Sequence, residues 1–175
     1  MIAYKSGSIF DSHAQVLVNP VNCMGISGAG LAKEFKSRFR AANVVYEKAC
    51  KEGKLELFCH HILIVAPLGA DRQKPAIAFF PTKHYYWDSS RAAVVDKNLR
   101  VLAMDLEDLG YSSVAIPALG CGLGNLHWDK DVQPLIEATF GQSKILAEVY
   151  PPKGEKCQIA YSSQPTSGTS SQTTT

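Results

Sequence analysis

The sequence lacks the features that mark metal proteins, disulfide scaffolds and secreted chains. Its five cysteines are widely spaced, with no CxxC pair and no cysteine–histidine group at zinc spacing. No apolar run approaches the roughly 18 residues of a transmembrane helix, and residues 1–5 do not begin a signal peptide. We therefore expect a reduced, cytoplasmic protein that carries no metal or cofactor and has no membrane partner.

Net charge and nucleotide-binding fingerprints are also missing. The formal net charge of +2 is too small to predict nucleic-acid binding by itself. Lysines and arginines gather between residues 33 and 54, but glutamates are interspersed among them, which is typical of a solvent-exposed helix face. Neither a GxGxxG turn nor a lysine-bearing phosphate loop occurs, which argues against a Rossmann dinucleotide enzyme and a P-loop nucleotidase.

Most of the chain has an ordinary globular composition. Hydrophobic residues make up 46% and charged residues 19%, so residues 1–150 are expected to form one domain with a packed core. Beyond residue 150 the composition changes, and ten of the fourteen residues from 162 to 175 are serine or threonine. Such a segment buries too little apolar surface to offset its ordering entropy. We predict a flexible tail over residues 151–175, in which only residues 157–161 are suited to docking.

Short apolar runs alternate with helical patterns along the domain. Strands are predicted at residues 2–5, 16–19, 62–66, 76–80, 113–117 and 145–150. Helices are predicted at residues 31–50, 90–109 and 129–140. Candidate caps and ends are Ser89 or Ser90, Gly110 and Gly141. The alternation predicts an α/β layered fold with a sheet covered on both faces and ligands at the carboxyl ends of parallel strands.

Two glycine-rich loops follow predicted strands. Residues 113–117 lead into a loop with glycine at positions 120, 122 and 124, and residues 16–19 lead into a loop that runs to Gly30 and opens a helix. Glycine has no Cβ, so the backbone can adopt a positive φ and bring its N–H groups close to an anion. Two such loops suit a diphosphate.

Four segments together resemble a macrodomain. They are Val18-Asn-Pro-Val-Asn22, the glycine turn at 25–32, Phe79-Phe-Pro-Thr-Lys83 and the stretch 117–128. Within that family, the chain is most similar to the branch of DarG antitoxin macrodomains, which remove ADP-ribose from thymidine in DNA. The resemblance covers residues 1–150 and implies a three-layer α/β/α fold with a mixed, mostly parallel sheet that binds ADP-ribose across its strand ends.

The resemblance also implies roles for individual residues. Asn22 matches the asparagine that holds the distal ribose, and Lys83 matches the catalytic lysine that acts on the anomeric carbon of that ribose. Further ligand contacts, with the diphosphate loop among them, are implied for Ile9, Asn19, Gly28, Ala29, Gly30, Thr82, Leu119, Gly120, Cys121, Gly122, Leu123, Gly124 and Asn125.

The residues by themselves leave alternatives open. Lys83 is either an exposed strand-end lysine or an amine whose pKa is lowered by the aromatic residues that follow it. Asn22 either satisfies its own turn or uses its donor and acceptor to grip a ribose diol. The aromatic residues 85–87 either cover the core, which we expect, or stack on a base. Cys23 and Cys121 are expected to pack as small apolar side chains.

The chain departs from the family pattern at three positions. Many macrodomains have an aspartate that recognises the adenine amino group, but Ser8 stands there, so this recognition is weakened or moved to Asp11. DarG-type proteins usually carry a lysine where this chain has Ala29. Gly124 replaces the aspartate of the branch that acts on protein carboxylates, which favours a lysine-centred mechanism. Tyr150 is expected to stack on one end of the ligand.

The leading functional hypothesis is an ADP-ribosyl glycohydrolase that removes ADP-ribose from modified thymidine. Its expected partners are ADP-ribose, single-stranded DNA that carries ADP-ribosyl-thymidine and lies near the basic first helix, and a cognate ADP-ribosyltransferase toxin. The alternatives are a phosphatase for ADP-ribose 1''-phosphate and a non-catalytic module that reads or sequesters ADP-ribose or a related nucleotide.

Overall fold

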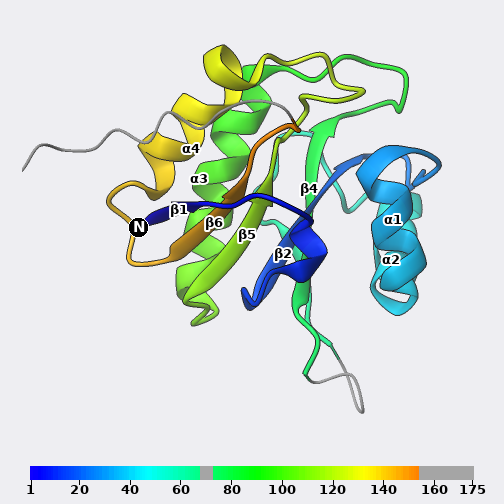
Figure 1. Ribbon diagram of the computed structural model, residues 1–175. Helices are drawn as coiled ribbons and strands as arrows, with labels where there is room; N and C mark the ends of the chain where they lie inside the picture. Colours follow the sequence, from blue (N-terminus) through cyan, green and yellow to red (C-terminus); the bar gives the residue numbers. More distant parts are fainter. Residues whose placement is uncertain (68–72, 154–175) are drawn as a thin grey trace, which may run out of the picture.

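The computed structural model describes residues 1–67 and 73–153 (Figure 1). In this part of the chain, six strands form one sheet in the order β1-β6-β5-β2-β4-β3. All neighbouring strands are parallel except β3 and β4, which are antiparallel. The strands are β1 (Ile2–Tyr4), β2 (Val16–Asn22), β3 (Leu63–Val65), β4 (Ala76–Lys83), β5 (Ser113–Pro117) and β6 (Leu146–Tyr150).

Helices cover both faces of this sheet. Helices α3 (Ala92–Asp108) and α4 (Gln133–Phe140) lie on one face, and α1 (Gly30–Arg38) and α2 (Arg40–Lys51) lie on the other (Figure 1). A short 3₁₀ helix (Ile9–Asp11) and a π-helical turn (Trp128–Val132) complete the described helices. The predicted three-layer α/β/α fold with a mixed, mostly parallel sheet is confirmed.

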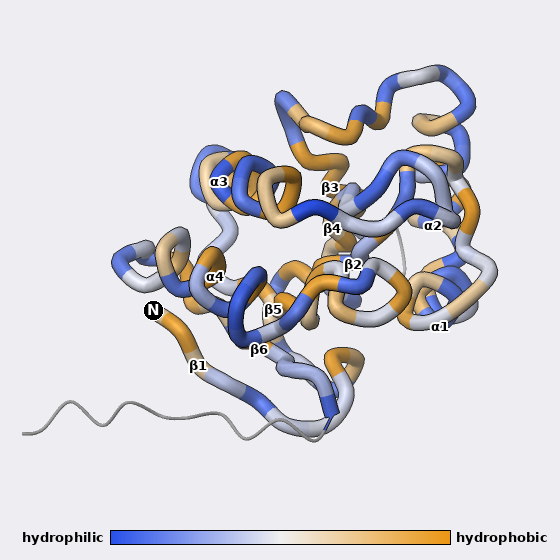
Figure 2. The backbone as a smooth tube through the Cα atoms, turned by 90° about the horizontal axis from the view of Figure 1, so that it is seen from above, coloured by the Kyte–Doolittle hydropathy of each residue, from blue (hydrophilic) through white to orange (hydrophobic). Residues whose placement is uncertain are grey.

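The alternation of side chains along the central strands produces two separate cores. On β2, Val16 and Val18 pack toward α3 and α4, whereas Leu17 and Val21 pack toward α1 and α2. In the view from above, hydrophobic stretches gather where the strands meet the helices (Figure 2). Burial on both faces explains why these strands are continuously apolar rather than alternating in sequence.

The structure corrects the prediction of one helix over residues 31–50. The helix is interrupted at Phe39, whose φ of −126° and ψ of 57° are not helical, so α1 and α2 are separate helices. The Phe39 ring lies 5.8 Å from the ring of Phe35 and 6.4 Å from that of Phe10, centroid to centroid. Apolar residues continue at helical spacing through the interruption because both helices pack on the same hydrophobic core. The spacing therefore does not reveal where one helix ends and the next begins.

The predicted serine cap of the helix at 90–109 is wrong. Helix α3 begins at Ala92, its N-cap is Arg91, and no side chain caps it. The backbone N–H of Ser90 instead donates to the carbonyl oxygen of Gly124 at 2.8 Å, so Ser90 supports the second glycine-rich loop. At the other end, Gly110 follows the helix with a φ of +75°, as expected of a residue that ends a helix.

Neither a spanning helix nor a metal cluster is found in the described residues. None of their helices combines the length and the hydrophobicity that crossing a bilayer requires. No group of three or more histidine, cysteine, aspartate or glutamate side chains is placed to hold a metal ion. The predicted tail, apart from residues 151–153, lies outside the described residues, and so does the stretch 157–161.

Candidate active site

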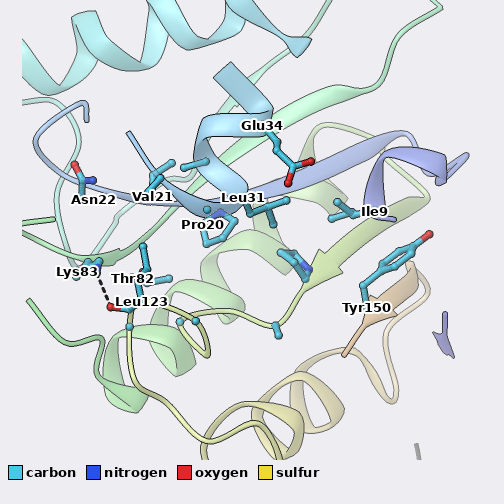
Figure 3. Close-up of a pocket in the computed structure, with 18 of the residues that line it drawn as sticks. Ile9, Pro20, Val21, Asn22, Leu31, Glu34, Thr82, Lys83, Leu123 and Tyr150 are labelled. Carbon is cyan, nitrogen blue, oxygen red and sulfur yellow. Dashed lines mark hydrogen bonds between the residues drawn. The ribbon is translucent and has the colours of Figure 1, made fainter. Parts of the chain in front are cut away.

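The carboxyl ends of four parallel strands meet at one edge of the sheet and border a cavity of about 870 Å³ (Figure 3). The strand register pairs Asn22 of β2 with Lys83 of β4, and Pro117 of β5 with Tyr150 of β6. All four residues line the cavity. The position agrees with the rule that open α/β sheets bind ligands outside the carboxyl ends of their strands.

A β-bulge shapes the floor of the cavity beside Lys83. Val21 pairs with Pro81 and Asn22 pairs with Lys83, so Thr82 is an extra residue on β4. A bulge redirects side chains that would otherwise alternate between the two faces. The consecutive residues Thr82 and Lys83 both line the cavity beside this bulge.

Lys83 bridges the end of β4 and the second glycine-rich loop. Its Nζ donates to the carbonyl oxygen of Leu123 at 2.9 Å (Figure 3) and to that of Asp88 at 3.1 Å. Burial lowers the pKa of the Lys83 amine below its ordinary value, against the opposing effect of the Asp88 carboxylate. The amine is therefore held at the cavity wall and loses its proton more readily than an exposed lysine does.

The Asn22 side chain satisfies its own turn. Its Oδ1 accepts from the backbone N–H of Met24 at 3.0 Å and of Ile26 at 3.3 Å, and its Nδ2 donates to the Ile26 carbonyl at 2.8 Å. The hydroxyl of buried Tyr46 donates to the Asn22 backbone carbonyl at 2.8 Å. The amide oxygen is thus fully engaged, and one amide hydrogen is left for a ligand, so Asn22 has a donor but no acceptor to offer a ribose.

The second glycine-rich loop has glycines for two different reasons. Gly120 has a φ of +71°, as the sequence predicts for such a loop. Gly124 has no positive φ, but a Cβ there would lie 2.3 Å from Ser90 Oγ and 2.5 Å from the Gly120 carbonyl oxygen. Close packing on Ser90 and on the Gly120 backbone, rather than backbone conformation, therefore disfavours any side chain at position 124, including that of an aspartate. A Cβ on Gly122 would meet open space.

Residues of both glycine-rich loops line the same cavity. In the described residues, the N–H groups of Cys121 and Asn125 close turns within the second loop, whereas those of residues 122–124 have no backbone partner. The first loop brings Gly28, Ala29 and Gly30 to the cavity at the N-terminus of α1. Free amides and a helix N-terminus both favour an anion.

The cavity also has a tyrosine at the end far from Lys83 and a carboxylate between the two ends. Figure 3 shows Tyr150 and Ile9 at the opposite end from Lys83, with Glu34 of α1 between. The hydroxyl of Ser8 accepts from the Phe10 backbone N–H at 3.3 Å and caps the 3₁₀ helix. Asp11 is not among the residues that line the cavity, and Glu34 is the one carboxylate among the described residues that does.

The structure brings most of the predicted site residues together. Eleven of them line the cavity: Asn22, Lys83, Ile9, Gly28, Ala29, Gly30, Thr82, Gly120, Gly122, Leu123 and Gly124. Four do not. Leu119 is fully buried in the core, Cys121 packs against that core, and Asn125 is exposed with its Nδ2 3.2 Å from Ser89 Oγ. Asn19 is fully buried, and its side-chain amide has no hydrogen-bond partner in the described structure.

Two features of the site escaped prediction from the sequence. Glu34 follows Gly30 by four residues, so helical spacing places it one turn above the loop; its position among lysines suggested only an exposed face. The expectation that residues 85–87 cover the core is wrong. Tyr85, Tyr86 and Trp87 are 43%, 52% and 62% exposed, because β4 ends at Lys83 and the chain turns outward.

Burial raises the pKa of the Cys23 thiol to about 12, in agreement with its predicted packing role.

The family model of the Macro domain matches residues 18–135, which contain both glycine-rich loops and Lys83. The chain belongs to the macrodomain family. The Mycobacterium tuberculosis protein named DNA ADP-ribosyl glycohydrolase is 36% identical over 154 residues, which are 88% of this chain and 43% of that protein. The macrodomain therefore spans less than half the length of this curated relative.

Two solved macrodomain structures are similar over nearly the same region. The macrodomain of M. tuberculosis DarG is 37% identical with a TM-score of 0.79, and the match covers 87% of this chain and 98% of that one. Thermosipho africanus DarTG in complex with ADP-ribose is 31% identical with a TM-score of 0.77, and the match covers 86% of this chain and 41% of that one.

Proposed function

We propose that this macrodomain is an ADP-ribosyl glycohydrolase that removes ADP-ribose from modified thymidine in DNA. The observation that carries the proposal is Lys83, an amine of lowered pKa held between two backbone carbonyls at one end of a cavity of about 870 Å³. The relatives named DNA ADP-ribosyl glycohydrolase support the same activity.

The residues that line the cavity support one arrangement of ADP-ribose in this proposal. The distal ribose lies at the end with Lys83 and Asn22, where the remaining amide hydrogen of Asn22 donates to a ribose oxygen. The diphosphate lies between the amides of the two glycine-rich loops. The adenine lies against Tyr150 and Ile9, where the Glu34 carboxylate accepts a hydrogen bond from the exocyclic amino group in place of the aspartate missing at Ser8.

This arrangement supports a two-step displacement at the anomeric carbon. The neutral Lys83 amine attacks that carbon, the bond to the thymine breaks, and the base leaves with the electron pair and takes a proton from water. A water molecule then attacks the same carbon, the bond to Nζ breaks, and free ADP-ribose and the lysine are released.

Since the modified base has to be made before it is removed, a cognate DNA ADP-ribosyltransferase is the expected partner, as in a toxin–antitoxin pair.

The test is to incubate the protein and its Lys83→Ala variant with a thymidine-ADP-ribosylated oligonucleotide and to measure free ADP-ribose. We expect release by the parent and by Lys130→Ala, an exposed-lysine control, and a loss of at least 100-fold in Lys83→Ala with ADP-ribose binding retained. If the parent binds ADP-ribose and releases none, the protein is a reader. If it releases phosphate from ADP-ribose 1''-phosphate instead, it is a phosphatase.

A further inference from the structure

Four aromatic side chains form an exposed cluster directly after Lys83. We call His84, Tyr85, Tyr86 and Trp87 the aromatic rim. The rings of Tyr85 and Trp87 are stacked, with centroids 4.9 Å apart and planes within 2° of parallel. Tyr86 meets Trp87 edge-on at 4.7 Å, and His84 meets Tyr85 edge-on at 4.5 Å. The rim belongs to neither hydrophobic core, so core packing does not explain it.

The backbone of the rim is fixed in place. The Tyr85 N–H donates to Asp88 Oδ2 and the Asp88 N–H donates to the Tyr85 carbonyl, both at 3.1 Å. The His84 carbonyl accepts from the Cys23 N–H at 3.0 Å, which ties the rim to the end of β2. The Asp88 carbonyl accepts from Lys83 Nζ. An exposed aromatic surface whose backbone is already held in place is suited to bind a partner, because little conformational entropy is lost on binding.

The rim lies at the end of the cavity where the acceptor of the ADP-ribose has to emerge. Tyr86 lines the cavity, and Lys83, the residue that precedes the rim, marks the distal-ribose end. Exposed apolar side chains of Ile26 and Leu123 also border this end, with 40% and 69% of their surfaces accessible. An acceptor joined to the distal ribose therefore leaves the cavity directly onto a surface of aromatic and aliphatic groups.

We propose that the aromatic rim stacks on nucleobases next to the modified thymidine of a single-stranded DNA substrate. The proposal rests on the glycohydrolase function above. Flat aromatic rings bind unstacked bases through their faces, whereas the bases of a duplex have no free faces to offer. A protein acceptor presents few flat groups beside the modified residue. The rim thereby selects single-stranded nucleic acid over duplex and protein substrates without reading sequence.

The test compares two substrates that differ only in flanking bases: ADP-ribosylated thymidine mononucleoside and the same nucleoside within a single-stranded heptanucleotide. Stacking on an aromatic side chain is worth about 5- to 150-fold in affinity per base. We therefore expect Trp87→Ala to raise KM for the heptanucleotide at least about fivefold more than KM for the mononucleoside, with kcat for the heptanucleotide changed less than about threefold. Leu109→Ala, which removes a comparably exposed hydrophobic side chain at the far end of α3, should change neither KM.

Equal effects of Trp87→Ala on both substrates, or no effect on the heptanucleotide, would overturn the proposal. A Trp87→Ala effect on an ADP-ribosylated peptide as large as that on the heptanucleotide would assign the rim to protein acceptors instead. If the parent hydrolyses neither substrate, the glycohydrolase function fails, and tryptophan fluorescence still tests the rim. Stacked bases should quench the 62%-exposed Trp87 on titration with modified heptanucleotide, and buried Trp128 should give the unchanged signal that remains in Trp87→Ala.

Discussion

Replacing Gly124 by alanine tests whether the second glycine-rich loop depends on close packing against Ser90. The new Cβ would lie 2.3 Å from Ser90 Oγ and 2.5 Å from the Gly120 carbonyl oxygen, well inside normal contact distances. The Gly120 carbonyl is part of the backbone and the Ser90 side chain is short, so neither group can move away independently. The loop therefore has to shift. Overpacking of this kind costs about 1–3 kcal/mol.

The size of this cost determines the expected shifts. For a domain of this length, each kcal/mol lowers Tm by roughly 2–4 °C, so we expect Gly124→Ala to lower Tm by about 2–12 °C. The loop carries amides that we assign to the diphosphate, so we also expect ADP-ribose affinity to fall about tenfold or more. Thermal unfolding and isothermal titration calorimetry measure the two effects. Gly122→Ala is the matched stability control, because its Cβ would meet open space at an ordinary φ.

A second substitution shows which contact is responsible. Ser90 Oγ is buried without a hydrogen-bond partner in the described structure, so Ser90→Ala alone should leave stability unchanged or raise it slightly. Combined with Gly124→Ala, it removes the shorter of the two clashes and should recover about 0.5 kcal/mol or more of the loss. The packing argument is refuted if Gly124→Ala shifts Tm by less than 1 °C, or if Ser90→Ala makes the double variant no more stable than Gly124→Ala.

Three further predictions concern other parts of the site. Burial lowers the pKa of Lys83, and the neutral amine is the attacking form, so kcat should rise with pH and level off below the ordinary lysine pKa of about 10.4. A pH–rate profile that levels off at or above that value would contradict the assignment. Glu34→Ala should weaken ADP-ribose binding about 5- to 10-fold but leave unchanged the binding of the hypoxanthine analogue, which lacks the amino group; equal losses for both ligands in calorimetry would place Glu34 elsewhere. Asn98→Ala should lower the free energy of unfolding in urea by about 2–4 kcal/mol, because the buried Asn98 amide hydrogen-bonds to the backbone of Leu57, Cys59 and Pro81 and so holds the end of β4. A loss below about 1 kcal/mol would show that these backbone groups find other partners.

Much of the fold could be predicted from the chain because local patterns and tertiary packing agree there. The strand at 113–117 and the following glycine loop were located by apolar run and composition alone, since β5 is buried on both faces. The break at Phe39 and the start of α3 at Ala92 could not be predicted in the same way. At Phe39 the burial pattern continues across the break, and before α3 a better cap candidate, Ser90, is used by a loop more than thirty residues away.

The amino-acid sequence by itself indicated the family, through the resemblance of four motifs. It also determined the layered fold and the two glycine-rich loops at strand ends, because these follow from short-range periodicity and from backbone conformations and close contacts that only glycine accepts. Only the tertiary structure decided how the site is assembled. The register and bulge between β2 and β4 set Asn22 opposite Lys83 and turn Thr82 inward, and a helix turn brings Glu34 to the cavity. The outward course of the chain after β4 exposes the aromatic rim. These outcomes depend on contacts between segments far apart in the chain, which no local pattern contains.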